Sequence, residues 1–308
     1  MVDRVKAPGP DHDRRSTDVG PEADDRKSAA VRHAIRSELA VDAPADEARA
    51  ATRSSEESVV ELQHVSLAFD VPIIEDVSLV TREGETVAIV GESGTGKSTI
   101  LKLVLRLLVP DRGRVLIDGQ DITPLTFEEA LAVRQKMGMV FQGAALFDSM
   151  SVFENVAYPL REHTQMNDDE IDQRVREKLQ FVDLDVDRVI EQFPAELSGG
   201  MRKRVGLARA IVLDPKIVLY DEPTTGLDPI ASDSIDKLIL RVRDRLNVTS
   251  VVVTHDMRSA RRLGQRILML HEKKIYAAGT PDEIFGSSDP IVRRFVEGTS
   301  ETTVEQAL

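Results

Sequence analysis

One eight-residue stretch constrains the fold of this chain more than any other, namely Gly91-Glu92-Ser93-Gly94-Thr95-Gly96-Lys97-Ser98. It matches the pattern G-x-x-x-x-G-K-[ST] and lies between an aliphatic run, Thr86–Val90, and a helical pattern, Thr99–Leu108. In such a turn, glycines let backbone N–H groups converge on a phosphate, and the N-terminus of the following helix adds positive partial charge. The alternative, a glycine-rich turn with an unrelated lysine, is disfavoured by these flanking segments.

This stretch predicts a nucleotide-phosphate site. Lys97 would supply a point charge to the β and γ phosphates, and the Ser98 hydroxyl would ligate Mg²⁺. The predicted nucleotide-binding residues here are Gly91, Glu92, Ser93, Gly94, Thr95, Gly96, Lys97, Ser98 and Thr99.

Composition limits the remaining possibilities. The chain has 308 residues, of which 41% are apolar and 30% charged, which is typical of a soluble α/β protein with a sizeable core. The absence of Cys excludes disulfides and thiolate chemistry. A net charge of -13 argues against nucleic acid as a partner. No run approaches the roughly 20 apolar residues of a membrane span, and no secretory signal is visible, so we expect a cytoplasmic protein.

The chain changes character near residue 58. Residues 1–57 contain no aromatic residue and only Ile35 and Leu39 as large aliphatics, which predicts a disordered tail. Beyond them, aliphatic runs alternate with helical patterns, as in a parallel sheet covered by helices. The expected strands are Val59–Phe69 and Asp76–Val80, which form an antiparallel edge, and Thr86–Val90, Met137–Phe141, Ile217–Tyr220 and Ser250–Thr254. Residues 143–214 are richer in helical periodicity, and one helix is expected to start at Asp168 and bury Ile171, Val175, Leu179 and Val182.

Two adjacent carboxylates end the predicted strand at Lys216–Glu222. Asp221 could orient Mg²⁺ through water, and Glu222 could polarise a water in line with the γ phosphorus. Taken alone, a strand that ends in Asp-Glu is as often a solvated strand end.

Further segments resemble those of the ATP-binding cassette (ABC) ATPases. Leu197-Ser198-Gly199-Gly200-Met201 is similar to the LSGGQ signature, with Met201 where Gln is usual. Gln142 then matches the Q-loop, the segment 226–229 with Asp228 matches the D-loop, and His255 matches the H-loop, in the family's order. The resemblance covers residues 59–286.

The resemblance implies a fold and a domain plan. The fold class is α/β, a P-loop NTPase (RecA-like) core with an antiparallel β subdomain and an inserted α-helical subdomain. The ABC ATPase domain would occupy residues 58–286, with the helical subdomain at about 143–214. Residues 287–308 would form a C-terminal helix and tail.

The resemblance also implies a site shared by two chains. Two cassettes would associate head to tail, so that each ATP lies between one P-loop and Ser198, Gly199 and Gly200 of the other chain. His255 would contact the γ phosphate and Glu222, Gln142 would sense the metal and the water, and Asp228 would cross the dimer seam. For His255 the alternative is an ordinary histidine at a strand end. Lys97, Gln142, Glu222 and His255 are the expected catalytic residues, and Ser98, Gln142 and Asp221 the expected Mg²⁺ ligands.

An aromatic residue upstream of the P-loop usually stacks on adenine in this family. Phe69 occupies that register, although it could equally be a core residue of the first sheet.

Four segments resemble the ATPases of Mla- and Mce-type lipid transport systems. They are Ala145–Phe147, Asn155–Thr164, Ser198–Arg204 and Asp289–Gly298. The resemblance implies a transmembrane permease, MCE-domain lipid-binding proteins, a small regulatory subunit, and a location on the cytoplasmic face of the inner membrane.

The permease is expected to dock near Leu146–Tyr158. The alternative places five apolar side chains of this segment in the subdomain core, namely Leu146, Phe147, Val152, Phe153 and Val156. For the whole chain, the competing functions are an ATPase of a polar-solute importer, a soluble ABC ATPase acting on the ribosome or DNA, and a regulatory module that holds ATP without turnover.

Overall fold

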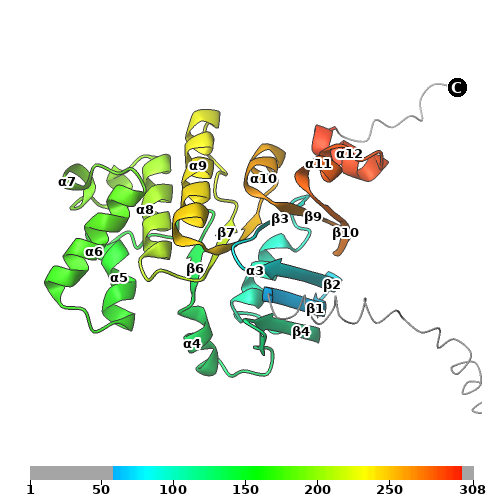
Figure 1. Ribbon diagram of the computed structural model, residues 1–308, viewed down its shortest axis with the longest axis horizontal. Helices are drawn as coiled ribbons and strands as arrows, with labels where there is room; N and C mark the ends of the chain where they lie inside the picture. Colours follow the sequence, from blue (N-terminus) through cyan, green and yellow to red (C-terminus); the bar gives the residue numbers. More distant parts are fainter. Residues whose placement is uncertain (1–57, 300–308) are drawn as a thin grey trace, which may run out of the picture. The chain divides into compact units, whose positions relative to one another are not determined.

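The computed structural model describes residues 58–299 (Figure 1). The predicted tail at residues 1–57 and the last residues, 300–308, lie outside this described part. Two sheets organise it, one of four strands in the order β2-β1-β4-β5 and one of six strands in the order β10-β9-β3-β8-β7-β6.

The four-stranded sheet is antiparallel, as predicted for its first two strands. It consists of β1 (Ser58–Ala68), β2 (Pro72–Arg82), β4 (Arg112–Ile117) and β5 (Gln120–Asp121). Alternate residues of β1, such as Val60 and Leu62, are buried while their neighbours are not, because one face covers the core. The apolar and polar alternation therefore predicted the antiparallel pairing correctly, but β1 is an inner strand of a separate sheet, between β2 and β4, and not an edge strand.

The six-stranded sheet is parallel except for β10, the strand at one of its edges. Its members are β3 (Thr86–Gly91), β6 (Met137–Val140), β7 (Ile217–Asp221), β8 (Thr249–Val253), β9 (Arg266–His271) and the antiparallel β10 (Lys274–Gly279). Every residue of β3 and β8 is buried, as expected of strands covered on both faces. The four buried strands predicted from aliphatic runs are confirmed, but β4, β5, β9 and β10 were not predicted.

Helix α3 (Lys97–Val104) lies between the two sheets. Ile100, Leu101, Leu103 and Val104 are all fully buried in one cluster with β1, β3 and β8. Since α3 begins directly after the glycine-rich turn, this packing fixes the turn against the sheet.

Four α-helices, besides the short 3-10 helix η1 (Pro194–Glu196), follow β6 in the predicted helical region. They are α5 (Val152–His163), α6 (Asp168–Phe181), α7 (Val186–Val189) and α8 (Gly199–Ile211). Ser151 with Glu154 and Asn167 with Glu170 form capping boxes that start α5 and α6. Helix α6 begins at Asp168 and its predicted apolar residues, with Val182 just beyond its end, are at most 3% exposed, so that prediction is confirmed.

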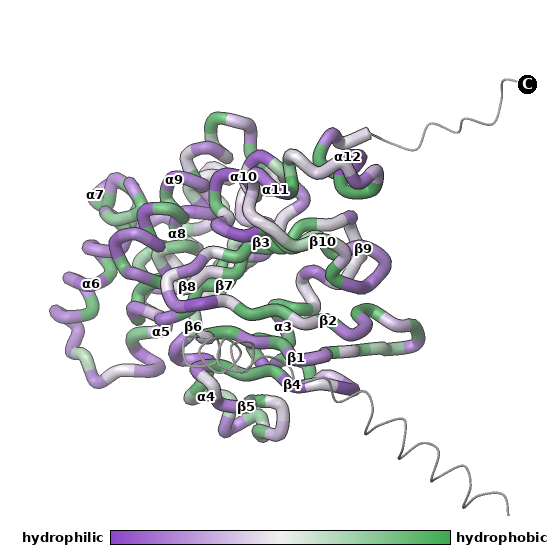
Figure 2. Tube along the Cα trace, turned by 45° about the vertical axis from the view of Figure 1, so that its right-hand side comes forward, coloured by the Kyte–Doolittle hydropathy of each residue, from purple (hydrophilic) through white to green (hydrophobic). Residues whose placement is uncertain are grey.

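The remaining helices are α4 (Glu129–Arg134), α9 (Pro229–Leu246), α10 (Met257–Leu263), α11 (Pro281–Phe285) and α12 (Pro290–Glu297). Figure 2 shows hydrophobic residues concentrated along the central strands and hydrophilic residues along the outer helices. Among residues 58–299, no helix has both the length and the apolar composition needed to cross a membrane.

A buried carboxylate joins α9 to α10. Asp236 is 3% exposed and accepts a hydrogen bond of 3.0 Å from the Ser259 hydroxyl, while Arg262 lies 3.7 Å from the same oxygen. Burial raises the pKa of Asp236 to about 6, although Ser259 and Arg262 act in the opposite direction. Asp256 and Asp233 add to the rise. The ionised form of Asp236 therefore costs stability in the folded protein.

This carboxylate predicts a specific pH dependence. The folded protein holds the Asp236 proton up to pH about 6, whereas the unfolded chain releases it near 3.8, so the free energy of unfolding falls as pH rises between these values. Asp236→Asn should remove that fall, so that its free energy of unfolding rises relative to the wild type by about 3 kcal/mol from pH 3 to pH 7. Urea unfolding at several pH values in this range measures the free energy of unfolding of both proteins. If that free energy changes with pH in the same way in the variant and the wild type, Asp236 is not the group responsible.

Candidate nucleotide-binding site

The predicted phosphate loop follows β3 and closes onto α3. Gly91 has φ +154°, and a Cβ there would lie 2.4 Å from the carbonyl oxygen of Leu270. Gly96 has φ +97°, and its Cβ would lie 2.7 Å from a methyl carbon of Ile74. Both positions need glycine, because the loop passes close to β9 and β2.

Lys97 begins α3 and its ammonium group turns back into the loop. Its Nζ donates hydrogen bonds of 2.8 Å to the carbonyl oxygens of Gly91 and Glu92, and the residue is 7% exposed. Burial lowers the pKa of Lys97, while the carboxylates of Glu222, Asp221 and Glu92 oppose that change. The loop thus holds a buried cation beside the position where an anion would lie.

Ser98 joins this loop to the end of β7. Its hydroxyl donates a hydrogen bond of 2.8 Å to Oδ1 of Asp221. Two of the predicted metal ligands, 123 residues apart in sequence, are therefore in contact. A hydroxyl and a carboxylate are hard oxygen donors, which is the ligand chemistry that Mg²⁺ prefers.

Glu222 and His255 form a close pair at the adjacent strand ends. Nδ1 of His255 lies 2.8 Å from Oε2 of Glu222, whose side chain is 12% exposed while that of His255 is 54% exposed. The Thr225 hydroxyl donates to the same oxygen at 3.0 Å. Glu222 has φ +49°, a left-handed conformation that is uncommon for a residue other than glycine. The carboxylate is therefore held in one orientation.

These groups surround one cavity of about 410 Å³. It is lined by Ile73, Ser93, Gly94, Gly96, Lys97, Ser98, Thr99, Gln142, Glu222 and His255. All four of the expected catalytic residues thus lie around one space, although they come from four separate segments of the sequence.

Other predicted residues lie at the margin of this cavity. Gly91, Glu92 and Thr95 belong to the loop but do not line the space, and Asp221 reaches it only through Ser98. Phe69 follows β1 and is 64% exposed. The alternative that it is a core residue is therefore wrong, while its stacking on adenine stays a prediction.

The signature residues of this chain do not reach the cavity. Ser198 caps α8 by accepting a hydrogen bond from the N–H of Met201, and Gly199 and Gly200 form its first turn. Asp228 caps α9 in the same way, with Ile230 and Ala231 as donors. None of these four residues lines the space around Lys97.

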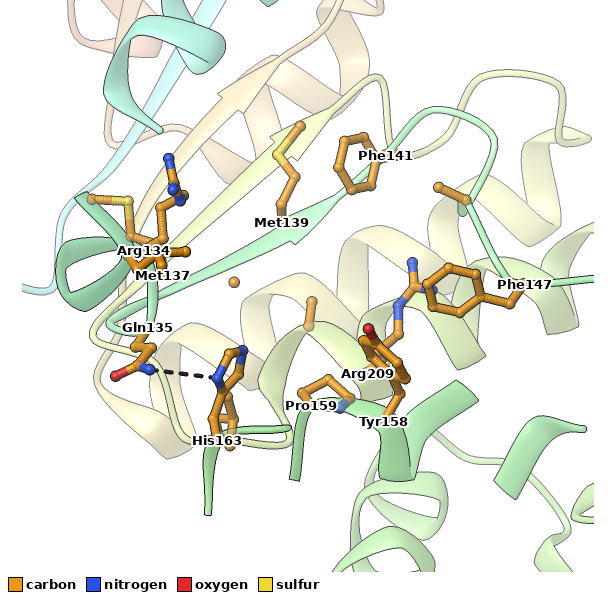
Figure 3. A pocket seen from close by; sticks show the side chains of 15 residues that line it. Arg134, Gln135, Met137, Met139, Phe141, Phe147, Tyr158, Pro159, His163 and Arg209 are labelled. Carbon is orange, nitrogen blue, oxygen red and sulfur yellow. Dashed lines mark hydrogen bonds between the residues drawn. The ribbon is translucent and has the colours of Figure 1, made fainter. Parts of the chain in front are cut away.

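A second hollow, of about 440 Å³, lies between β6, α4, α5 and α8 (Figure 3). The rings of Phe147 and Tyr158 lie 5.2 Å apart and the Arg209 guanidinium lies 5.6 Å from the Phe147 ring centre. We call this hollow, with Phe141, Phe147, Tyr158, Pro159 and Arg209 on its wall, the α5–α8 groove.

The apolar residues of the segment 146–158 divide between core and groove. Val152 and Val156 are fully buried, and Leu146 and Phe153 pack against the same core. Phe147 and Tyr158, in contrast, are 42% and 40% exposed. The alternative that these five side chains are all core is therefore correct for Val152 and Val156 and wrong for Phe147.

Structural contacts reveal residues that the sequence analysis missed. Asn155 is fully buried and bonds to the main chain of Phe147, Met150 and Ser151, which fixes the loop before α5. Lys203 of α8 contacts the main chain of both Gln142 and Glu222. Only the proximity of Lys203 to the signature motif could have marked it in the sequence.

Known proteins resemble this chain over the same region. A family model described as ABC transporter matches residues 74–225. A probable ribonucleotide transport ATP-binding protein of Mycobacterium leprae is 45% identical over 226 residues, 73% of this chain and 65% of that protein. The chain thus spans less than two thirds of the length of this relative.

A second relative is matched over more of its length. An intermembrane phospholipid transport system ATP-binding protein of Haemophilus influenzae is 43% identical over 232 residues, which cover 75% of this chain and 87% of that protein. A solved dimeric ATP-binding cassette in a post-hydrolysis state, bound to ADP and phosphate, is 34% identical with a TM-score of 0.68 over 72% of this chain and 99% of its own. The chain therefore belongs to the ABC transporter family of ATP-binding cassette ATPases.

Proposed function

We propose that this chain is the ATP-binding and hydrolysing subunit of a membrane transporter for phospholipid or another hydrophobic substrate. The observation that carries the ATPase assignment is the gathering of Lys97, the Ser98–Asp221 pair and the Glu222–His255 pair around one cavity. The lipid assignment is supported by the phospholipid transport relative, of which the chain spans 87%.

The residues of the cavity suit phosphoryl transfer to water. The loop N–H groups and Lys97 bind the β and γ phosphates. Glu222 accepts a proton from the attacking water as its oxygen bonds to the γ phosphorus and the bond to the β–γ bridging oxygen breaks, which gives ADP and phosphate. His255 and Thr225 keep the Glu222 carboxylate in place, and His255 would also contact the γ phosphate.

A divalent cation fits the donor set. Ser98, Asp221 and Gln142 would hold Mg²⁺ directly or through water, and the ion would neutralise charge on the phosphates when bound. Within residues 58–299 no cluster of three His, Cys, Asp or Glu residues could hold a metal. Binding of the ion would therefore draw on phosphate oxygens as well as on these side chains.

A second copy of the chain would complete the site. Ser198, Gly199 and Gly200 do not line the cavity of their own chain, but they offer N–H groups at the start of a 13-residue helix. The solved dimeric cassette with ADP and phosphate supports a pair of chains. In a head-to-tail pair, these residues and Asp228 would face the partner's nucleotide.

The α5–α8 groove would receive a transmembrane permease, and the chain would then lie on the cytoplasmic face of the inner membrane. Its wall of exposed aromatic rings beside Arg209 suits an amphipathic helix with an acidic or polar edge (Figure 3). MCE-domain lipid-binding proteins and a small regulatory subunit would be further components of the assembly.

Ribonucleotide transport is a second candidate, because the mycobacterial relative carries that name at 45% identity. It corresponds to the alternative of a polar-solute importer. We favour lipid, since the chain covers 87% of the phospholipid relative but 65% of the mycobacterial one.

Removing the proposed base should separate binding from turnover. Glu222→Gln should lower ATP hydrolysis by about 100-fold or more, because the water loses its proton acceptor, while ATP still binds and stabilises a dimer. Phosphate release and light scattering measure the two effects. Glu272→Gln, at an exposed carboxylate between β9 and β10, is the matched control. Equal turnover in the Glu222 variant and the wild type would remove Glu222 from this role.

The groove assignment can be tested with two similar tyrosines. Tyr158→Asp should abolish stimulation of hydrolysis by the reconstituted permease and leave ATP affinity within about twofold, since the groove is separate from the nucleotide cavity. Tyr276→Asp, at a residue that is 43% exposed on β10, should retain stimulation. Loss of stimulation in both variants, or in neither, would refute docking in the groove.

The substrate class is open to direct measurement. The assay uses proteoliposomes that contain the chain and its permease, and it measures the rate of ATP hydrolysis. This rate should rise when a phospholipid-binding protein that can accept the transported lipid is added. It should stay unchanged when ribonucleotides are supplied on the side of the membrane from which substrate is taken up. The reverse response would establish the second candidate in place of the first.

A further inference from the structure

We propose that Lys203 is a positioning residue that ties the main chain at Gln142 to the main chain at Glu222. Through this tie, α8 would set the geometry of both catalytic segments at once. The inference deepens the proposed function and rests on it, since it assigns a role to a residue beside the same cavity.

The geometry of Lys203 is that of a bridge between two strand ends. Its Nζ lies 2.5 Å from the carbonyl oxygen of Gln142 and 3.3 Å from that of Glu222. These carbonyls follow β6 and β7, which are paired in parallel, so their ends lie side by side. One ammonium group on α8 thus binds both ends where the catalytic side chains leave the sheet.

The charge of Lys203 is costly at this position. The residue is 7% exposed, and burial lowers its pKa, while the carboxylates of Glu222 and Asp221 act in the opposite direction. A buried ammonium group is retained only where its hydrogen bonds and nearby charges offset its desolvation. Here the compensation comes from the catalytic segments themselves, so the lysine and the site stabilise one another.

Other residues of α8 contact the segment that follows Gln142. A Cβ on Gly206 would lie 3.2 Å from Cβ of Ala144, and the Arg209 guanidinium donates a hydrogen bond of 3.0 Å to the Ala144 carbonyl. Ala144 itself has φ +63°, an unusual conformation that these contacts support. Helix α8 therefore holds this segment at several points, of which Lys203 is nearest the cavity.

This face also connects the two functional regions of the chain. Arg209 lies six residues beyond Lys203 on α8. Its guanidinium lies against Phe147 in the α5–α8 groove (Figure 3). Ser198, at the other end of the helix, caps its first turn. A shift of α8 caused by a partner at either end would reach Gln142 and Glu222 through the Lys203 ammonium group.

Lys178 provides a matched control for burial. It is 2% exposed, its Nζ bonds to Asp214 at 2.8 Å, and burial lowers its pKa as well. Its partners are Asp214 and Glu177, neither of which lines the nucleotide cavity. Replacing Lys178 removes a buried ammonium group without touching either catalytic segment.

The test compares Lys203→Met, Lys203→Arg and Lys178→Met in the purified full chain with ATP. Lys203→Met should lower kcat by about tenfold or more with ATP affinity within about threefold, because the P-loop is intact. Lys203→Arg should restore most of kcat, since its guanidinium can donate to both carbonyls. Lys178→Met should lower the thermal midpoint but keep kcat within about twofold when assayed below that midpoint.

Amide hydrogen exchange gives a readout that does not depend on turnover. Lys203→Met should speed exchange in segments 143–147 and 222–225, and Lys178→Met should leave both segments at the wild-type rate. If Lys203→Met fails to fold, Lys203→Gln, which keeps one neutral donor group, replaces it in the same comparison with Lys203→Arg.

The proposal is overturned if exchange in both segments is unchanged in the neutral variant, or if arginine is no better than methionine. Failure of the proposed function is a separate result. A wild-type chain that does not hydrolyse ATP would refute that function, while the exchange contrast between the Lys203 and Lys178 variants would still decide whether Lys203 holds the two segments.

Discussion

The parallel pairing of β3, β8, β7 and β6 is the constraint on which the site depends. Thr86 pairs with Ser250, Ile217 with Thr249, and Met137 with Ile217, so these strands end at the same edge of the sheet. The P-loop, His255, Glu222 and Gln142 each follow one of these ends. Strand register therefore brings together groups that are far apart in the sequence, such as Gly91 and His255, which are 164 positions apart.

The buried lysines Lys178, Lys97 and Lys203 differ in the groups that compensate their charge. Lys178 is balanced by Asp214 on a neighbouring segment, which ties α6 to the turn before β7. Within residues 58–299, Lys97 and Lys203, in contrast, bond only to main-chain carbonyls. Burial lowers the pKa of both, and the nearby carboxylates of Glu222 and Asp221 oppose that change. Both ammonium groups therefore interact with the same two carboxylates. An anion that enters the cavity would change the electrostatic energy of all four groups together.

The sequence predicted several parts of the fold that have unbroken patterns, although it missed β9, whose residues 267–270 form an unbroken buried apolar run. Aliphatic runs such as Ile217–Tyr220 mark strands buried on both faces, and Asp168 with the spacing after it marks α6. Strand β4 was missed because half of its residues are exposed and it begins Arg-Gly-Arg. Strand β10 was missed because none of its residues is fully buried at the sheet edge: Ile275 is half-buried and Tyr276 is 43% exposed.

The candidate site was predictable where a motif names a side chain, and unpredictable where the contact is to the main chain. Lys97, Glu222 and His255 belong to recognisable patterns. Lys203 does not, because in the sequence it is one of three consecutive basic residues that resemble a solvated helix face. Only the three-dimensional position of the carbonyl oxygens of Gln142 and Glu222 distinguishes it from Arg202 and Arg204.

Ser198 connects the assembly of two chains to the catalytic segments of each chain. An N-terminal helix turn is a ready anion site, and in this chain it belongs to α8, the same helix whose Lys203 holds the catalytic segments. In the proposed head-to-tail pair, the phosphate bound at Ser198 is that of the partner's nucleotide. Each nucleotide would then act on two cavities, on one directly through the P-loop and on the other through α8, which gives a physical reason for the two sites of such a dimer to be coupled.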